Sequence, residues 1–282
     1  MPQTLYEFGG HPDAPVMHIA VANGFPPQTY IPLVEPFTDR YRVLSLPPRA
    51  LWNGQHQPAE TQNWYQLADD LLTGMEAHPL NNVIAVGHSF GGVASALAAI
   101  KQPKRFRALI LLDPTFMPLR FLNAVRLLRL FRAEQRMPLV PGALRRRARF
   151  ASVDEAYEYF KGKRLFADWS ARAVRLYAEG GLRPADDGNG MQLAWSPQWE
   201  AHYFKTVHTR SWRDIPKLRG LLPMLVIRGA STDTFIKDAA DKFCRLVPDA
   251  DYAEVPGHGH LFPQSAPEET RGIIEKWLEK LK

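Results

Sequence analysis

The chain alternates short apolar runs with longer stretches whose apolar residues recur at helical spacing. The runs end at turn-forming residues and are predicted to be buried strands: Val16–Ala22, Tyr41–Leu46, Asn82–Val86, Ala108–Leu112, Met224–Arg228 and Asp251–Val255. The stretches are predicted to be helices: Trp64–Ala77, Gly91–Ile100, Asp238–Leu246 and Glu268–Leu281. Because strands separated by helices form βαβ units, the pattern predicts an α/β fold: a mostly parallel sheet with helices on both faces.

The alternation stops in the middle of the chain. From about Met117 to Asp214 there are helix-like segments that contain Arg and Trp, without a convincing buried strand, and the alternation resumes after Pro223. A helical block inserted between two parts of one sheet is the simplest explanation. We therefore expect residues 1–116 and 215–282 to form one α/β core, and residues 117–214 to form a helical cap.

Composition is that of an ordinary globular protein. The 282 residues are 23% charged and 45% hydrophobic, which excludes a disordered or collagen-like chain. The single cysteine, Cys244, cannot form an internal disulfide, and Met1–Pro15 has no features of a secretory signal. We therefore expect a reducing, cytoplasmic location. The uncharged run Ala77–Ile100 carries polar residues and glycines near its centre, which argues against a membrane span.

The net charge of +6 has a local origin. Nine Arg and one acidic residue, Glu134, lie between Arg120 and Arg149, so this segment carries +8 and the remaining chain −2. Because the basic character is confined to one segment, and only Phe121 and Phe131 stand among its nine arginines, we expect no nucleic-acid partner.

The same segment has the periodicity of an amphipathic helix. One predicted face is apolar and comprises Ala124, Leu127, Leu128 and Phe131. A second predicted face is basic and comprises Arg129, Arg132 and Arg136. The favoured interpretation is a cap helix laid on the core with its arginines in solvent. Membrane contact through anionic lipid head groups is the less favoured alternative.

The most informative motif is Gly87-His88-Ser89-Phe90-Gly91, at the junction of a predicted strand and a predicted helix. A tight strand-to-helix turn exposes the serine hydroxyl at the sheet edge, and the flanking glycines allow the two backbones to approach. The helix N-terminus favours a developing anion. Ser89 is therefore predicted to be a nucleophile.

A serine needs a base to take its proton, and the base needs a group that fixes its tautomer. His258 and His260 follow the last predicted strand and are both candidates for the base. Asp233 follows the penultimate strand and is the preferred acid. Asp113 also follows a strand, but an Asp-Pro turn is the favoured interpretation there.

Together these motifs resemble those of cap-bearing serine hydrolases of the α/β-hydrolase fold superfamily. The resemblance covers about Val16–Asp113 and Pro223–Lys282. It implies that His260 is the base, while His258 occupies the variable position before it. It also implies an oxyanion hole made by the backbone N–H groups of Phe25 and Phe90.

The substrate pocket is predicted from residues near these motifs and from the aromatic residues of the cap. Its candidate members are Asn23, His88, His258, Trp195 and Trp199. A lid over a nucleophile needs an apolar underside, so we expect a small-molecule acyl substrate with a hydrophobic portion. The sequence has no metal-binding helix motif, cysteine cluster or Gly-rich phosphate loop, so neither a metal nor another cofactor is expected.

The leading hypothesis is a serine hydrolase that cleaves an ester or related acyl bond through an acyl-enzyme. Two alternatives stay open. One is hydrolysis of a carbon–carbon bond in a diketone-like ring-cleavage product, and the other is a hydrolase-like binding or receptor module with little turnover. A serine nucleophile disfavours epoxide hydrolysis and dehalogenation, which need a carboxylate.

Overall fold

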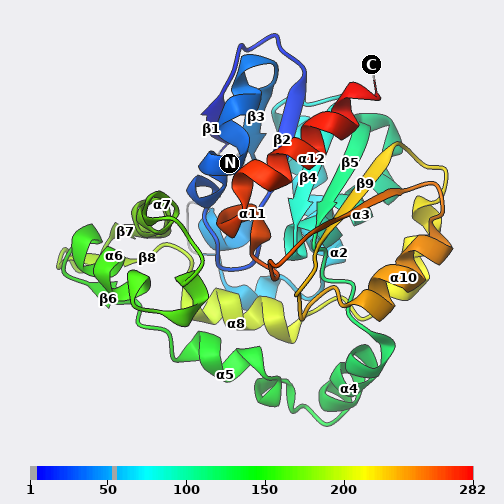
Figure 1. Cartoon of the computed structure of the whole chain (residues 1–282). Coiled ribbons are helices and arrows are strands. Elements are labelled where there is room, and N and C mark those ends of the chain that lie inside the picture. The colour runs from blue at the N-terminus through cyan, green and yellow to red at the C-terminus, as the bar shows by residue number, and fades with distance from the viewer. Residues whose placement is uncertain (1–4, 53–55, 282) are drawn as a thin grey trace.

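The computed structural model describes residues 5–52 and 56–281. Its centre is a seven-stranded sheet in the order β1-β3-β2-β4-β5-β9-β10 (Figure 1). The strands are β1 Tyr6–Gly9, β2 Val16–Ala20, β3 Arg42–Ser45, β4 Val83–His88, β5 Phe106–Leu112, β9 Met224–Gly229 and β10 Asp251–Val255. All neighbouring strands are parallel except the pair β1 and β3. The predicted α/β fold with a mostly parallel sheet is confirmed.

Helices cover both faces of this sheet (Figure 1). The core helices are α1 Ile31–Val34, α2 Tyr65–Ala77, α3 Phe90–Lys101, α10 Lys237–Leu246, α11 Phe262–Ser265 and α12 Pro267–Glu279. α2 and α3 pack against each other, and α12 packs against α1. The uncharged run Ala77–Ile100 forms β4 and most of α3. Among the described residues, no helix is long and apolar enough to cross a membrane.

Strand burial explains which strands the sequence predicts. Every residue of β4 and β9 is buried, as expected for central strands whose two faces are both covered. β1 is a four-residue edge strand that is only half-buried, and it carries no apolar run that would have predicted it.

Residues 117–214 lie between β5 and β9 and are mainly helical. Their helices are α4 Leu119–Leu130, α5 Leu139–Leu144, α6 Val153–Lys161, α7 Ala171–Gly181, α8 Pro197–Lys205 and α9 Ser211–Asp214. This insertion also contains a small antiparallel sheet in the order β6-β8-β7, which the sequence did not predict. Its strands are β6 Arg149–Phe150, β7 Leu182–Pro184 and β8 Met191–Leu193. Strands this short produce no recognisable period in the sequence.

The predicted orientation of α4 is wrong. Leu122 and Val125 face inward, whereas Leu127 is 55% and Phe131 70% exposed. Arg129 was predicted on the solvated face. It lies on the inward face instead, and its guanidinium donates to the carbonyls of Lys205, at 2.6 and 3.1 Å, and Val207, at 2.8 Å. These bonds hold Arg129 inward. Leu127 and Phe131 of the predicted apolar face therefore lie outward, while Leu128 of the same face is partly buried against the core.

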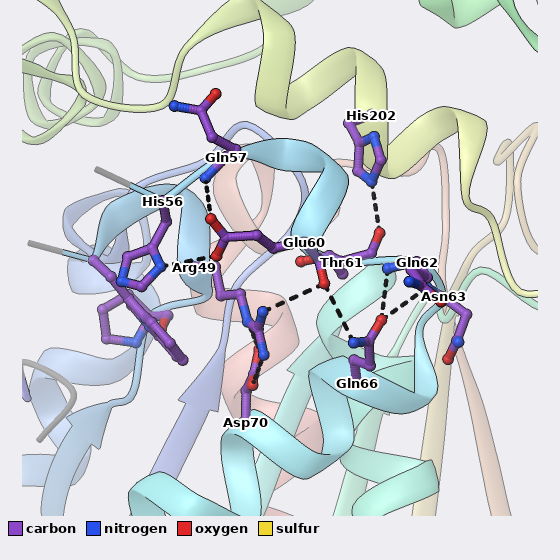
Figure 2. A network of polar contacts seen from close by, with 12 residues as sticks. Arg49, His56, Gln57, Glu60, Thr61, Gln62, Asn63, Gln66, Asp70 and His202 are labelled. Atoms are coloured by element: carbon purple, nitrogen blue, oxygen red, sulfur yellow. Dashed lines mark hydrogen bonds and ion pairs between the residues drawn. The ribbon is translucent and has the colours of Figure 1, made fainter. Parts of the chain in front are cut away.

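The loop after β3 connects the core to the insertion (Figure 2). Arg49 forms a bidentate ion pair with Asp70 of α2, at 2.6 and 2.7 Å. His202 of α8 donates from Nε2 to the carbonyl of Thr61 at 2.6 Å. The insertion is therefore attached to the loop that borders the carboxyl edge of the sheet.

Candidate active site

Ser89 occupies a sharp turn between β4 and α3. Its φ of 56° and ψ of −119° place a non-glycine residue in a strained conformation. The neighbouring glycines are required by close backbone approach. A Cβ on Gly87 would lie 2.6 Å from the Cα of Gly92, and a Cβ on Gly91 would lie 2.4 Å from the carbonyl oxygen of Ala20. This turn, which we call the elbow, thus holds the Ser89 hydroxyl at the carboxyl edge of the sheet.

His260 lies in the loop after β10 and contacts Ser89 directly. Its Nε2 is 2.8 Å from Ser89 Oγ, and its Nδ1 is 2.6 Å from Oδ2 of Asp113, at the end of β5. Because a carboxylate only accepts, Nδ1 carries the proton and Nε2 is free to accept from the serine. The three side chains therefore have the geometry of a nucleophile, a base and an orienting acid.

Asp113 is held in place by several donors. Besides His260, its carboxylate accepts from Thr232 Oγ1 at 2.6 Å and from the N–H of Gly229 at 3.1 Å. Its side chain is fully buried, and its φ of 42° lies in the left-handed region that non-glycine residues rarely adopt. These bonds offset both the backbone strain and the cost of burying a carboxylate.

Comparison with known proteins identifies the family. Residues 19–272 match the profile of the alpha/beta hydrolase family. The chain belongs to this family. The fold agrees, since the crystal structure of E-2-(acetamidomethylene)succinate hydrolase superposes with a TM-score of 0.75 at 23% identity, covering 98% of this chain and 94% of that one.

A sequence relative and a second solved structure are also similar to this chain. The chain is 27% identical to 2-(acetamidomethylene)succinate hydrolase of Mesorhizobium japonicum, over 88% of its own length and 82% of the relative's. The thioesterase domain from the curacin biosynthetic pathway shares the fold, with a TM-score of 0.72 at 16% identity, covering 96% of this chain and 94% of that one.

In this α/β hydrolase the acid beside His260 is not the one we predicted. Asp233 is exposed, and its side chain accepts from Thr234 Oγ1 at 3.3 Å. Asp113, which we had assigned to an Asp-Pro turn, contacts His260 instead. β5 and β9 are adjacent, with Leu112 opposite Ile227, so the loops after both strands reach the same edge. The preference for Asp233 is therefore corrected to Asp113.

His88 links the elbow to the loop that carries His260. Burial, reinforced by the neighbouring His260, holds the pKa of His88 well below its usual value, so the ring is neutral. Its Nε2 is 2.9 Å from the backbone carbonyl of His260 and must donate to it, because a carbonyl only accepts. Nδ1 then accepts from the Tyr30 hydroxyl at 2.7 Å. His88 therefore has a structural role, because it fixes the loop that carries His260 relative to the end of β4. We predict it instead, from the sequence, as a residue of the substrate pocket.

Thr115 lies at the site although no sequence motif predicts it there. Its hydroxyl lies 3.2 Å from Ser89 Oγ, and its N–H donates to the Ser89 carbonyl at 3.2 Å. Since Ser89 donates to His260, Thr115 is left to donate to the Ser89 oxygen. A lone threonine after an Asp-Pro pair carries no sequence signal for this role.

Thr115→Val is expected to lower kcat/KM for an ester substrate about three- to tenfold, the usual value of one neutral hydrogen bond. Thr115→Ser keeps the hydroxyl and should stay close to wild type. Equal losses in both variants would contradict a role for the hydroxyl and indicate a packing effect of the threonine methyl group.

The two predicted oxyanion donors differ in the structure. The N–H of Phe90 is at the first position of α3, where no intrahelical acceptor exists. The N–H of Phe25 donates to the carbonyl of Ala22 at 3.1 Å. An oxyanion role for Phe25 therefore requires this N–H to be shared between two acceptors, and both donors stay predictions.

The insertion of this α/β hydrolase contacts the loop that carries Phe25. Tyr177 of α7 donates to the carbonyl of Gly24 at 3.2 Å, and Asn23 Nδ2 donates to the backbone carbonyl of Glu200 at 3.0 Å. Arg146 forms an ion pair with the Glu200 carboxylate and donates to the Tyr177 hydroxyl. The predicted pocket residue Asn23 is thus buried under the insertion.

The other predicted pocket residues are distributed around the elbow. Trp195 is buried with its ring centroid 6.2 Å from that of Phe90, and Trp199 is buried against Tyr203, at 5.4 Å. His258 points elsewhere, since its Nδ1 is 2.9 Å from Ser265 Oγ.

Within residues 5–52 and 56–281, no group of three or more His, Cys, Asp or Glu side chains is arranged to hold a metal ion.

Proposed function

We propose that this α/β hydrolase is a serine hydrolase that cleaves an ester or related acyl bond of a substrate with a hydrophobic portion. The observation that carries the proposal is the continuous contact from Ser89 Oγ through the ring of His260 to Asp113, at 2.8 and 2.6 Å. The name of the thioesterase neighbour describes cleavage of an acyl bond, in keeping with this reaction class.

The reaction proceeds in two halves. Ser89 Oγ attacks the carbonyl carbon while its proton passes to Nε2 of His260, and the N–H of Phe90 stabilises the oxyanion. His260 then gives that proton to the leaving group, which departs and leaves an acyl-serine. Water attacks the acyl-serine with His260 as base, releasing the acid and regenerating the Ser89 hydroxyl. Asp113 orients the ring and stabilises its protonated form in both halves.

Aromatic side chains beside the elbow support a hydrophobic substrate portion. Phe25 is buried against two aromatic rings of the insertion, with centroids 6.0 Å away for Trp169 and 5.7 Å for Tyr177. Phe90 packs against Trp195 and against Tyr203, at 4.9 Å. Aromatic rings in this position would exclude water from an acyl-enzyme and favour an apolar acyl or alcohol group.

The proposal is tested with a fluorophosphonate probe and a panel of p-nitrophenyl esters of graded acyl length. We expect stoichiometric labelling, a covalent adduct on the peptide that contains Ser89, and turnover of at least one ester. The panel also includes a diketone ring-cleavage product and the succinate derivative named for the Mesorhizobium relative. Absence of both an adduct and turnover would favour the binding module, and turnover of the diketone alone would favour carbon–carbon hydrolysis.

A further inference from the structure

The insertion exposes an unusual concentration of large apolar side chains. Every such side chain that is exposed in the described part of the chain belongs to the insertion. One of them, Leu165, lies apart, and the others form the set Leu119, Leu127, Leu130, Phe131, Leu139 and Leu144. Leu130 is 75% and Leu139 61% exposed, values that are unfavourable in water unless another surface covers them.

The same segment carries arginines that are not neutralised. Four of them are exposed and make no ion pair or side-chain hydrogen bond to any residue within 5–52 or 56–281: Arg120, Arg132, Arg136 and Arg145. Glu134 is the one acidic residue between positions 114 and 153. We call these six apolar and four basic side chains the α4–α5 patch.

We propose that the α4–α5 patch binds the surface of an anionic lipid bilayer, with the leucines and Phe131 in the acyl boundary and the arginines at the lipid phosphates. Amphipathic segments with Leu or Phe beside unpaired Arg bind membrane interfaces through buried apolar area and attraction to anionic lipids. In Figure 1, α4 and α5 form the lower margin of the molecule, away from the central sheet.

Charge and composition argue against the other occupants of such a patch. A second copy of the chain docked through the same patch would bring the unpaired arginines of both copies together, which is repulsive. A protein partner would be expected to meet exposed Trp or Tyr, the usual anchors of such interfaces, but the exposed large apolar residues here are leucines and one phenylalanine.

Membrane binding would place the active site next to apolar substrates. α5 packs against α8, which carries Trp199 and Glu200. The backbone carbonyl of Glu200 accepts a hydrogen bond from Asn23, next to the predicted oxyanion loop. The inference does not depend on the proposed hydrolysis, because binding needs neither Ser89 nor His260.

The test is sedimentation of the full-length protein with vesicles of phosphatidylcholine alone or of phosphatidylcholine and phosphatidylglycerol in equal parts. We expect binding to the anionic vesicles that weakens as salt is raised, and much weaker binding to phosphatidylcholine alone. Ser89→Ala should bind like wild type, so a failure of the proposed chemistry and a failure of membrane binding give different results.

Two double variants test the two halves of the patch. Arg132→Gln with Arg136→Gln should weaken binding about 25-fold, from about fivefold per arginine. Leu130→Ser with Phe131→Ser should weaken it about 100-fold. The controls are Leu165→Ser, another exposed leucine of the insertion, and Arg219→Gln, an exposed arginine outside it. Neither control should change binding.

The proposal is overturned if wild-type protein does not sediment with anionic vesicles at low salt, or if the controls lose as much affinity as the patch variants. Light scattering provides the test of a dimer. If the wild-type protein is a dimer, does not bind vesicles, and becomes a monomer in the Leu130→Ser, Phe131→Ser double variant, the patch is assigned to a second copy. Circular dichroism and thermal melting should be unchanged in the two double variants and in both controls, because every side chain substituted in them is exposed.

Discussion

Asp113→Asn is expected to lower kcat about 10⁴-fold with little change in KM. An amide at this position can present its N–H₂ to Nδ1 of His260, which favours the tautomer whose Nε2 carries the proton and cannot accept from Ser89. The measurement is steady-state hydrolysis of the best p-nitrophenyl ester from the panel, compared with wild-type protein.

Asp233→Asn is the matched control, because it makes the same change in the neighbouring loop. Asp233 is exposed and does not touch His260, so this variant should retain wild-type kcat. A large loss from Asp233→Asn together with a small loss from Asp113→Asn would reverse our assignment of the acid. Thermal melting separates a catalytic effect from unfolding, since Asp113 also accepts from Thr232 and Gly229.

Ser89→Ala is expected to lower kcat about 10⁶-fold, because removal of a nucleophile disables the three side chains as a unit. Alanine adopts the Ser89 backbone conformation about as readily as serine does, and the lost contacts are two hydrogen bonds, to His260 and Thr115. The variant should therefore remain folded. It should also resist the fluorophosphonate probe.

Adding Asp113→Asn to Ser89→Ala should cost almost nothing further, which is the signature of residues that act together. Ester turnover by Ser89→Ala above about one hundredth of the wild-type rate, in protein purified free of host esterases, would contradict the assignment of the nucleophile.

The sequence predicted the core well because its central strands are buried on both faces. β4, β5 and β9 appear as nearly continuous apolar runs, which are typical of a parallel sheet covered on both faces. The elbow was predictable for a related reason, since Gly87 and Gly91 meet backbone atoms that leave no room for a Cβ. Where packing excludes every other residue type at a position, the residue found there predicts the local structure.

The acid was harder to predict because two adjacent strands end beside His260. Position in the sequence does not distinguish the loop after β5 from the loop after β9, and both contain an aspartate. The distinction comes from tertiary contacts, namely the hydroxyl of Thr232 and the N–H of Gly229, which both point at Asp113. These donors lie more than one hundred residues along the chain from it.

The orientation of α4 was unpredictable for a different reason. The helix has two apolar faces, one with Leu122 and Val125 and one with Leu127 and Phe131, and periodicity alone does not choose between them. Arg129 decides between them through its bonds to carbonyls near the end of α8, which are distant in sequence.

The contacts between the insertion and the loop at Asn23 and Gly24 have a consequence for substrate entry. Any movement that lifts α7 and α8 from the core must break the Tyr177–Gly24 and Asn23–Glu200 hydrogen bonds. The turn that presents the Phe25 amide would then lose its outer support at the moment the nucleophile becomes accessible. With Phe25 as the proposed second oxyanion donor, an opened molecule would admit substrate but hold only one of the two proposed donors in place, and reclosure would restore the other.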